Sequence, residues 1–215
     1  PWGKDSEFAF QVTCRLASAG ADHVGFTLRY EDGKRDMQFL LRRTGQLDIY
    51  FEGDGWSRTR LFEPIAHSAI KHPEAFNSIL VIVRGRLVEV YVNGIAVCDP
   101  IVLEHVITPC NMLIGGGGGK GARLEFQGVT VWPTENVPTP QEHLQRGAAP
   151  LKTALPAPFG SPLDALREGR TAAPDVSKAK VLFRVEFDDP KSGWPQGKYG
   201  DGKATRGYKS GKYFI

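Results

Sequence analysis

Apolar and polar residues alternate along much of the chain, and this alternation constrains the fold more than any other feature. An apolar residue stands at every second position in four segments, 8–16, 24–30, 37–41 and 47–51. Successive side chains of a β-strand point to opposite faces, so a period of two indicates strands with one buried face. The separators, such as 31–34 and 53–55, are rich in glycine and aspartate, which is typical of tight turns.

A second pair of strands is predicted between residues 79 and 94. Segments 79–83 and 87–92 are mostly apolar and are separated by Arg-Gly-Arg, which indicates a hairpin of two largely buried central strands. Asn93-Gly94 then predicts a tight turn, because both residues accept a positive φ. Short strands at regular spacing with such turns predict an all-β sandwich or barrel.

A run of five glycines precedes Lys120 within residues 114–126 (IGGGGGKGARLEF). A phosphate-binding loop requires G-x-x-x-x-G-K-[ST] followed by a helix. Here Ile114 replaces the first glycine, Gly121 replaces the hydroxyl residue, and the residues that follow alternate like a strand. The run therefore predicts a flexible loop between two strands rather than a nucleotide site.

Composition changes after Trp132. Residues 133–177 are rich in proline and alanine and poor in large apolar residues, which is typical of an extended or disordered linker. Strand-like alternation resumes at 181–187. We therefore expect a β-sandwich domain over 1–132, a linker over 133–177, and the opening strands of a second, similar and truncated domain over 178–215.

Charge and hydropathy argue against two classes of partner. The formal net charge is +3 and no basic run of five residues occurs, so nucleic acid is not expected as a partner. No apolar stretch approaches the ~20 residues of a membrane span. Among the three cysteines we expect Cys14 to be a buried free thiol. Cys98 and Cys110 flank one short segment, and the sequence leaves open whether they pair.

Catalytic signatures are missing from the sequence. It contains no G-x-S-x-G motif and no E-x-D-x-x-E strand motif. Glycoside hydrolysis needs two facing carboxyl groups, whereas Asp48, Glu52 and Glu89 are best interpreted as solvated or ion-paired charges. The sequence thus favours binding over catalysis.

No cofactor is indicated, although calcium remains open. Asp188 and Asp189 are candidate calcium ligands, but a turn-forming role before Pro190 is the favoured interpretation.

A candidate binding site lies on the face opposite the buried one. If the apolar residues of 24–51 face the core, the other face carries Thr27, Arg29, Gln38, Arg42, Asp48 and Tyr50, followed by Trp56 and Arg58. An exposed aromatic ring stacks on a sugar ring, and Arg and Asp form paired hydrogen bonds with neighbouring hydroxyls. We therefore assign Tyr50 and Trp56 to stacking, and Arg42, Asp48 and Arg58 to hydroxyl groups. The alternative is an ordinary polar outer face, with Trp56 in the core.

Two segments together resemble a known superfamily: 87–97 (LVEVYVNGIAV) and 121–132 (GARLEFQGVTVW). They are similar to the concanavalin A-like lectin/glucanase superfamily, in its laminin-G-like branch and its bacterial 3-keto-disaccharide-hydrolase-like branch, formerly domain of unknown function 1080. The resemblance covers about residues 7–132 and implies an antiparallel two-sheet β-sandwich of the jelly-roll type. Residues 183–195 (FRVEFDDPKSGWP) resemble the opening of such a domain in bacterial proteins that carry these modules in tandem.

The resemblance also implies an open sheet edge. The first and last strands of this fold lie close together, and Pro1 begins after the opening strands, so the first domain is expected to lack them and to leave one edge unpaired. Residues 181–187 are candidates to complete the first domain there, as donor strands do.

We therefore predict a non-catalytic module that binds carbohydrate or another cell-surface ligand within a larger bacterial protein. Its expected location is extracytoplasmic, meaning periplasmic, cell-surface or secreted. One alternative is a glycoside-acting hydrolase of the 3-keto-disaccharide type. The other is a structural or protein-interaction spacer.

Overall fold

The computed structural model describes residues 7–30, 35–52, 58–61, 63–103, 109–133, 181, 183–187, 194–199, 204–210 and 212–215. Within these ranges the secondary structure is entirely β, as expected. None of it is a helix of the length and apolarity that a membrane span requires.

Ten strands form the first sheet, here called sheet A. They are β1 (Glu7–Leu16), β7 (Asn77–Arg84), β8 (Leu87–Val92), β9 (Ile95–Ala96), β10 (Ile101–Val102), β12 (Leu124–Pro133), β13 (Phe183–Glu186), β14 (Gly197–Tyr199), β15 (Ala204–Tyr208) and β16 (Tyr213–Phe214). Their order is β10-β8-β7-β1-β12-β16-β15-β14, with β9 beside β8 and β13 beside β12.

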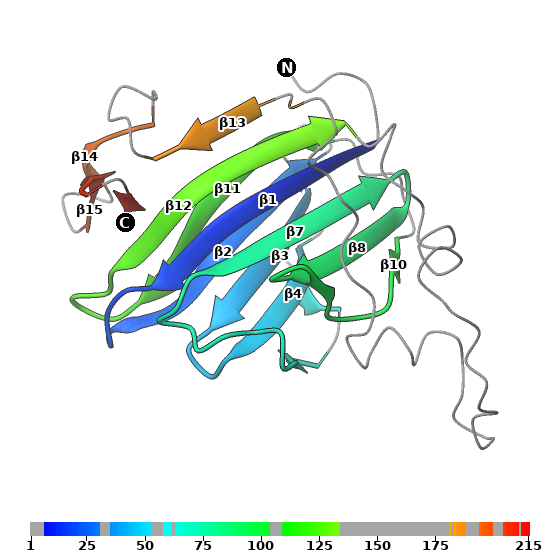
Figure 1. Cartoon of the computed structure of the whole chain (residues 1–215), viewed down its shortest axis with the longest axis horizontal. Coiled ribbons are helices and arrows are strands. Elements are labelled where there is room, and N and C mark those ends of the chain that lie inside the picture. Colours follow the sequence, from blue (N-terminus) through cyan, green and yellow to red (C-terminus); the bar gives the residue numbers. More distant parts are fainter. Residues whose placement is uncertain are drawn as a thin grey trace.

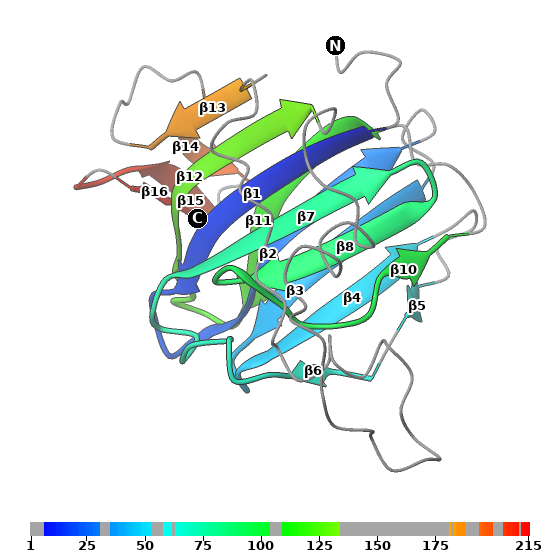
Figure 2. The same ribbon diagram turned by 45° about the vertical axis from the view of Figure 1, so that its right-hand side comes forward.

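Six strands form the second sheet, here called sheet B. They are β2 (Ala21–Tyr30), β3 (Arg35–Arg42), β4 (Gln46–Glu52), β5 (Arg58–Arg60), β6 (Ile65–Ala66) and β11 (Pro109–Gly118). Their order is β11-β2-β3-β4-β5, with β6 beside β4. The chain crosses between the sheets after β1, β6, β10 and β11, and the two sheets lie face to face (Figures 1 and 2). The antiparallel two-sheet sandwich with jelly-roll crossings is therefore confirmed.

The core between the sheets consists of the side chains that the alternation predicts as buried. Phe26 stacks on Phe39 of the neighbouring strand with ring centroids 5.0 Å apart, and it meets Phe10 of sheet A edge-on at 4.8 Å. Both geometries are the favourable ones for aromatic pairs. These three rings therefore connect the two sheets at the centre of the sandwich.

The predicted turn at Asn93-Gly94 is confirmed. Both residues have a positive φ, 51° and 84°, which a tight hairpin turn requires. The Asn93 side chain has a further role that the sequence did not reveal. Its Nδ2 donates to the Ala69 carbonyl at 2.8 Å and to Oδ1 of the buried Asn77 at 2.9 Å, so this turn also holds the loop before β7.

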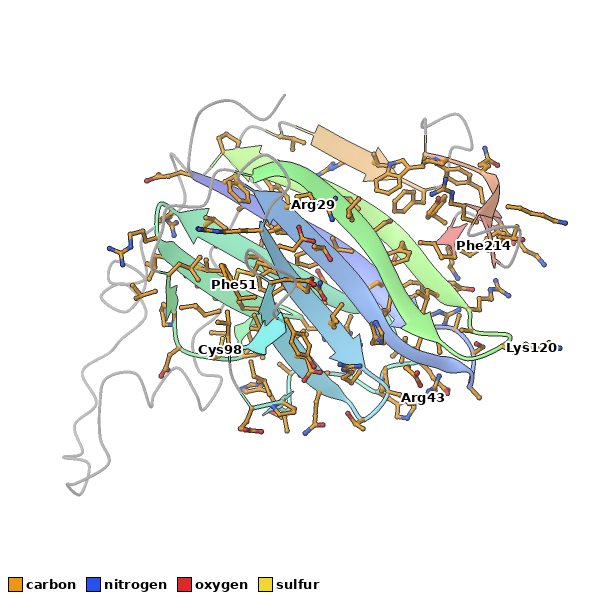
Figure 3. All side chains as sticks on the ribbon, turned by 180° about the vertical axis from the view of Figure 1, so that it is seen from behind. Arg29, Arg43, Phe51, Cys98, Lys120 and Phe214 are labelled. Atoms are coloured by element: carbon orange, nitrogen blue, oxygen red, sulfur yellow. The ribbon has the colours of Figure 1, made fainter. Side chains whose placement is uncertain are left out.

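The glycine run is a strand, which corrects the prediction of a flexible loop. It forms the second half of β11 and pairs with β2 as far as Gly118. A Cβ atom at Gly116 would lie 2.1 Å from the His23 carbonyl oxygen, so only glycine allows the two backbones to approach this closely. The turn itself comes later, at Lys120 and Gly121, with Lys120 at its outer tip (Figure 3).

The C-terminal strands extend sheet A beyond β12. Strand β13 pairs with residues 128–131 and β16 pairs with residues 125–126, both on the side of β12 opposite β1 (Figures 1 and 2). Val185, Phe187 and Tyr213 are buried in the main core. Apart from Pro133, the predicted linker 133–177 lies outside the described residues, and the division into two domains stays a prediction.

Candidate functional site

Three of the five predicted site residues form one hydrogen-bonded group on the outer face of sheet B. Arg42 Nε donates to Asp48 Oδ2 at 2.5 Å, and its Nη2 donates to the Tyr50 hydroxyl at 3.0 Å. The Tyr50 hydroxyl in turn donates to Asp48 Oδ2 at 3.0 Å. The remaining nitrogen, Nη1, lies 3.4 Å from Nδ1 of His23 on β2. These four residues are called the Arg42 cluster below.

Strand geometry explains why the Arg42 cluster assembles. Asp48 and Tyr50 are two residues apart on β4, so their side chains point to the same face. The neighbouring strand β3 ends at Arg42, and its register places His23 of β2 directly opposite Arg42. The hairpin between β3 and β4 therefore brings the guanidinium beside both partners.

Burial distinguishes the members of the Arg42 cluster. Asp48 is 1% exposed and Tyr50 is 8% exposed. The expected ion pair of Asp48 is confirmed by its contact with Arg42, but this carboxylate is buried rather than at the surface. Burial lowers the pKa of Arg42, but the hydrogen bonds and charges of Asp48 and Tyr50 outweigh burial and leave the pKa raised. The guanidinium thus stays positively charged, and Asp48 and Tyr50 offer little surface to a ligand.

The structure describes the other two predicted site residues, Trp56 and Arg58, only in part or not at all. Trp56 lies outside the described residues, as do Asp188 and Asp189, the candidate calcium ligands. The backbone of Arg58 pairs with Glu52 at the start of β5, while its side chain is outside the described part. The roles assigned to these residues stay predictions.

A groove of about 220 Å³ lies next to the Arg42 cluster, over β11, β2 and β3. This face of sheet B is turned toward the viewer in Figure 3, where Arg29 and Arg43 mark its two ends. The groove side chains used below are His23, Thr27, Gln38, Leu40 and Leu113. Thr27 and Gln38 were predicted as outward residues, but the groove was not predicted from the sequence.

Two glycines explain the depth of the groove. Gly115 of β11 and Gly25 of β2 are cross-strand partners, so two neighbouring positions of this face lack a side chain. A Cβ atom at Gly25 would lie 1.9 Å from the Phe39 carbonyl oxygen, whereas one at Gly115 would contact nothing within 4 Å. Gly25 is therefore required by the backbone, and Gly115 opens into the groove.

The outer face of sheet A holds a separate buried carboxylate, Glu89. It is 3% exposed, accepts a 2.6 Å hydrogen bond from the Tyr91 hydroxyl, and forms an ion pair with Arg84. Burial raises the pKa of Glu89, and the same burial, together with the charge of Glu89, raises the pKa of Tyr91. Neither Tyr91 nor Arg84 carries a carboxyl group, and the buried acid Asp48 lies on sheet B. Glu89 and Asp48 therefore do not form the facing acid pair that glycoside hydrolysis needs.

The raised pKa of Glu89 predicts a pH dependence of stability. Between the ordinary value of 4.5 and the higher folded-state value, the folded chain binds more protons than the unfolded chain. The contribution of Glu89 is therefore fully present below this window and is lost as the pH rises through it. Glu89→Gln removes the titrating group, so the decline of Tm across the window is expected to flatten.

Thermal melts of both proteins between about pH 4 and about pH 8 check this expectation. Glu63→Gln makes the same change of charge at an exposed position and is expected to keep the slope of the unaltered chain. Equal slopes in all three proteins would contradict the assignment to Glu89.

Cysteine and metal chemistry are limited in the described part. Cys14 and Cys98 are free thiols, and burial raises the pKa of each to about 12, which keeps them unreactive at neutral pH. A Cys98–Cys110 disulfide is thus not formed. Among the residues that the structure describes, no three His, Cys, Asp or Glu side chains are grouped so that they could hold a metal ion.

No family model matches the chain, and no curated protein matches it. A carbohydrate-binding module from Bacillus subtilis is similar in structure, with 11% identity, 58% of this chain and 74% of that chain covered, and a TM-score of 0.47. A galectin from Caenorhabditis elegans has 16% identity; the match covers 55% of this chain and 80% of the galectin, with a TM-score of 0.40. Domains LG4-5 of the mouse laminin alpha1 chain have 14% identity; the match covers 58% of this chain and 35% of the laminin chain, with a TM-score of 0.39. Similarity at this level identifies no site residue in this chain.

Proposed function

We propose that the chain is a non-catalytic module that binds carbohydrate through the outer face of sheet B. The observation that carries the proposal is the groove of about 220 Å³ beside the Arg42 cluster. A sheet of paired strands is a rigid support, and polar groups fixed by hydrogen bonds lose little entropy when a ligand binds. An ordinary polar outer face has no such depression.

The proposal assigns different tasks to the predicted residues. Trp56 stacks on a sugar ring, and Arg58 of β5 donates to its hydroxyls. Arg42 retains an exposed fraction of 27% for its side chain, enough for a direct contact at the rim of the groove. Asp48 and Tyr50 hold that guanidinium in place.

The wider setting is part of the same proposal. The module belongs to a larger, extracytoplasmic bacterial protein with repeated domains of this kind, and its ligand is a polysaccharide or another cell-surface component. Calcium, if it takes part, is held by Asp188 and Asp189. A spacer module would need no groove, and a hydrolase would need a facing acid pair, so the described geometry favours binding.

Glycan-array binding of the full chain tests the proposed function. We expect binding in the presence of calcium, and we expect Trp56→Ala to reduce it by at least about tenfold, since loss of one stacking ring removes about 1.4 kcal/mol or more. Loss of binding in EDTA would add calcium to the site. A blank array obtained with a protein that melts cooperatively would overturn the proposal and favour the spacer alternative.

A further inference from the structure

We propose that the groove over β11, β2 and β3 is the primary subsite and that it takes one uncharged sugar ring. This inference rests on the proposed function and adds the ligand class and the place where the ring lies. It places the main contacts in the groove rather than on Arg42, Asp48 and Tyr50, to which the sequence analysis assigned them; His23 belongs to both groups.

The shape of the groove fits a single ring. Pockets for drug-sized molecules measure about 300–1,000 Å³, and the groove, at about 220 Å³, is smaller. Gly115 lines the groove and has no side chain, so a flat ligand can lie directly against the backbone at this position. Side chains stand on both sides of it, with His23 at one end and Thr27 opposite Gln38 at the other.

The chemistry of the walls fits a sugar better than a purely apolar ligand. Leu113 is 42% exposed and lines the groove together with Leu40, which provides an apolar wall for the C–H face of a ring. Thr27 provides a hydroxyl for the ring hydroxyls. The Gln38 amide, which donates to Glu52 at 2.9 Å, and the His23 imidazole, which lies 3.4 Å from Arg42, are the other polar groups of the wall. A pyranose or furanose ring has both kinds of surface.

The charge of the walls selects neutral sugars. The lining residues include no carboxylate, no lysine and no arginine. A carboxylate or sulfate group placed against Leu40 and Leu113 would lose hydration, and the Arg42 guanidinium at the rim is already paired with Asp48, so burying such a group there is unfavourable. We therefore infer discrimination against uronic acids, sialic acids and sulfated sugars. A single ring has few atoms to contribute binding energy, so Kd is expected to be about 1 mM.

Gly115→Val provides the decisive variant. Because a Cβ atom there contacts nothing within 4 Å, the new side chain projects into the groove without displacing the backbone, and valine favours strands. Gly119→Val is the matched control, because its Cβ also meets open space but lies in the turn after β11. Leu113→Glu is an independent second variant that places a negative charge on the wall.

The experiment measures binding of the full chain to a panel of neutral methyl glycosides, with glucuronic acid and sialic acid as charged probes, by calorimetry or chemical-shift titration. Expected are binding of at least one neutral glycoside, a loss of at least about tenfold in Gly115→Val and Leu113→Glu, and no change in Gly119→Val. Binding that survives both groove variants overturns the subsite and leaves the proposed function standing. Preference for the charged probes overturns the ligand class. A full chain that binds no glycan on the panel or on the array overturns both proposals.

Discussion

A protein that ends at residue 180 is expected to melt at least about 10 °C below the full chain, if it folds at all. Truncation removes Val185, Phe187 and Tyr213, which are 6%, 0% and 1% exposed and belong to the main core. Complete burial of one such side chain contributes about 1.5–3 kcal/mol, and each kcal/mol shifts Tm by roughly 2–4 °C in a chain of this size. Differential scanning calorimetry of both proteins measures the difference.

Backbone and charged contacts support the same expectation. Ile215 exchanges two backbone hydrogen bonds with Leu124, of 3.0 and 3.2 Å. The buried Glu125 accepts hydrogen bonds from Arg15 and Arg123, and Lys212 of the C-terminal segment lies 3.7 Å from it. Removing the segment therefore exposes the edge of β12 and takes one cation from a buried carboxylate.

Two point variants serve as controls for the truncation. Phe187→Ala leaves the chain intact and is expected to cost about 3–5 kcal/mol through the cavity that it creates. Lys209→Ala alters an exposed residue of the same segment and is expected to leave Tm unchanged. If the truncated protein melts at the same temperature as the full chain, residues 183–215 form a separate unit and do not complete the first sandwich.

Addition of a synthetic peptide covering 181–215 to the truncated protein separates loss of stability from irreversible misfolding. Because β13 and β16 pair with the same edge of β12, the peptide is expected to bind there and to raise Tm further as its concentration increases. A peptide without effect would argue that the segment folds only when it is covalently attached.

The inward positions of β2, β3 and β4 could be predicted from sequence because each strand alternates large apolar and polar residues. Phe26, Phe39 and Ile49 occupy the positions that a period of two assigns to the core. The glycine run could not be assigned in this way, because glycine has no side chain to alternate. Its strand depends on the close approach of β2, in particular at Gly116, which is a property of the folded chain.

The candidate site was predictable in part for the same reason. Arg42, Asp48 and Tyr50 come from one hairpin, so strand alternation alone places them on one face. The burial of Asp48 and Tyr50 was not predictable, because it depends on the packing around them. The groove was not predictable either, since Gly25 and Gly115 become partners only when distant segments pair as β2 and β11.

Arg42→Ala is expected to lower the free energy of unfolding by about 3 kcal/mol or more. The substitution removes the guanidinium that donates to Asp48 at 2.5 Å, and a buried carboxylate that loses its cation destabilises the folded state by roughly this amount. It also removes the contacts to Tyr50 and His23. Urea unfolding of both proteins gives the difference directly.

A double variant distinguishes a stabilising role of the ion pair from the energetic cost of removing only one of its two charges. Arg42→Met combined with Asp48→Leu replaces both charges by apolar side chains, and such replacements are often neutral or stabilising. We expect it to unfold within about 1 kcal/mol of the unaltered chain. If it is as unstable as Arg42→Ala, the ion pair itself stabilises the sandwich. If the double variant is stable and still binds glycan, the Arg42 cluster supports the outer face without contacting the ligand. If it is stable but no longer binds glycan, Arg42 contributes a direct contact.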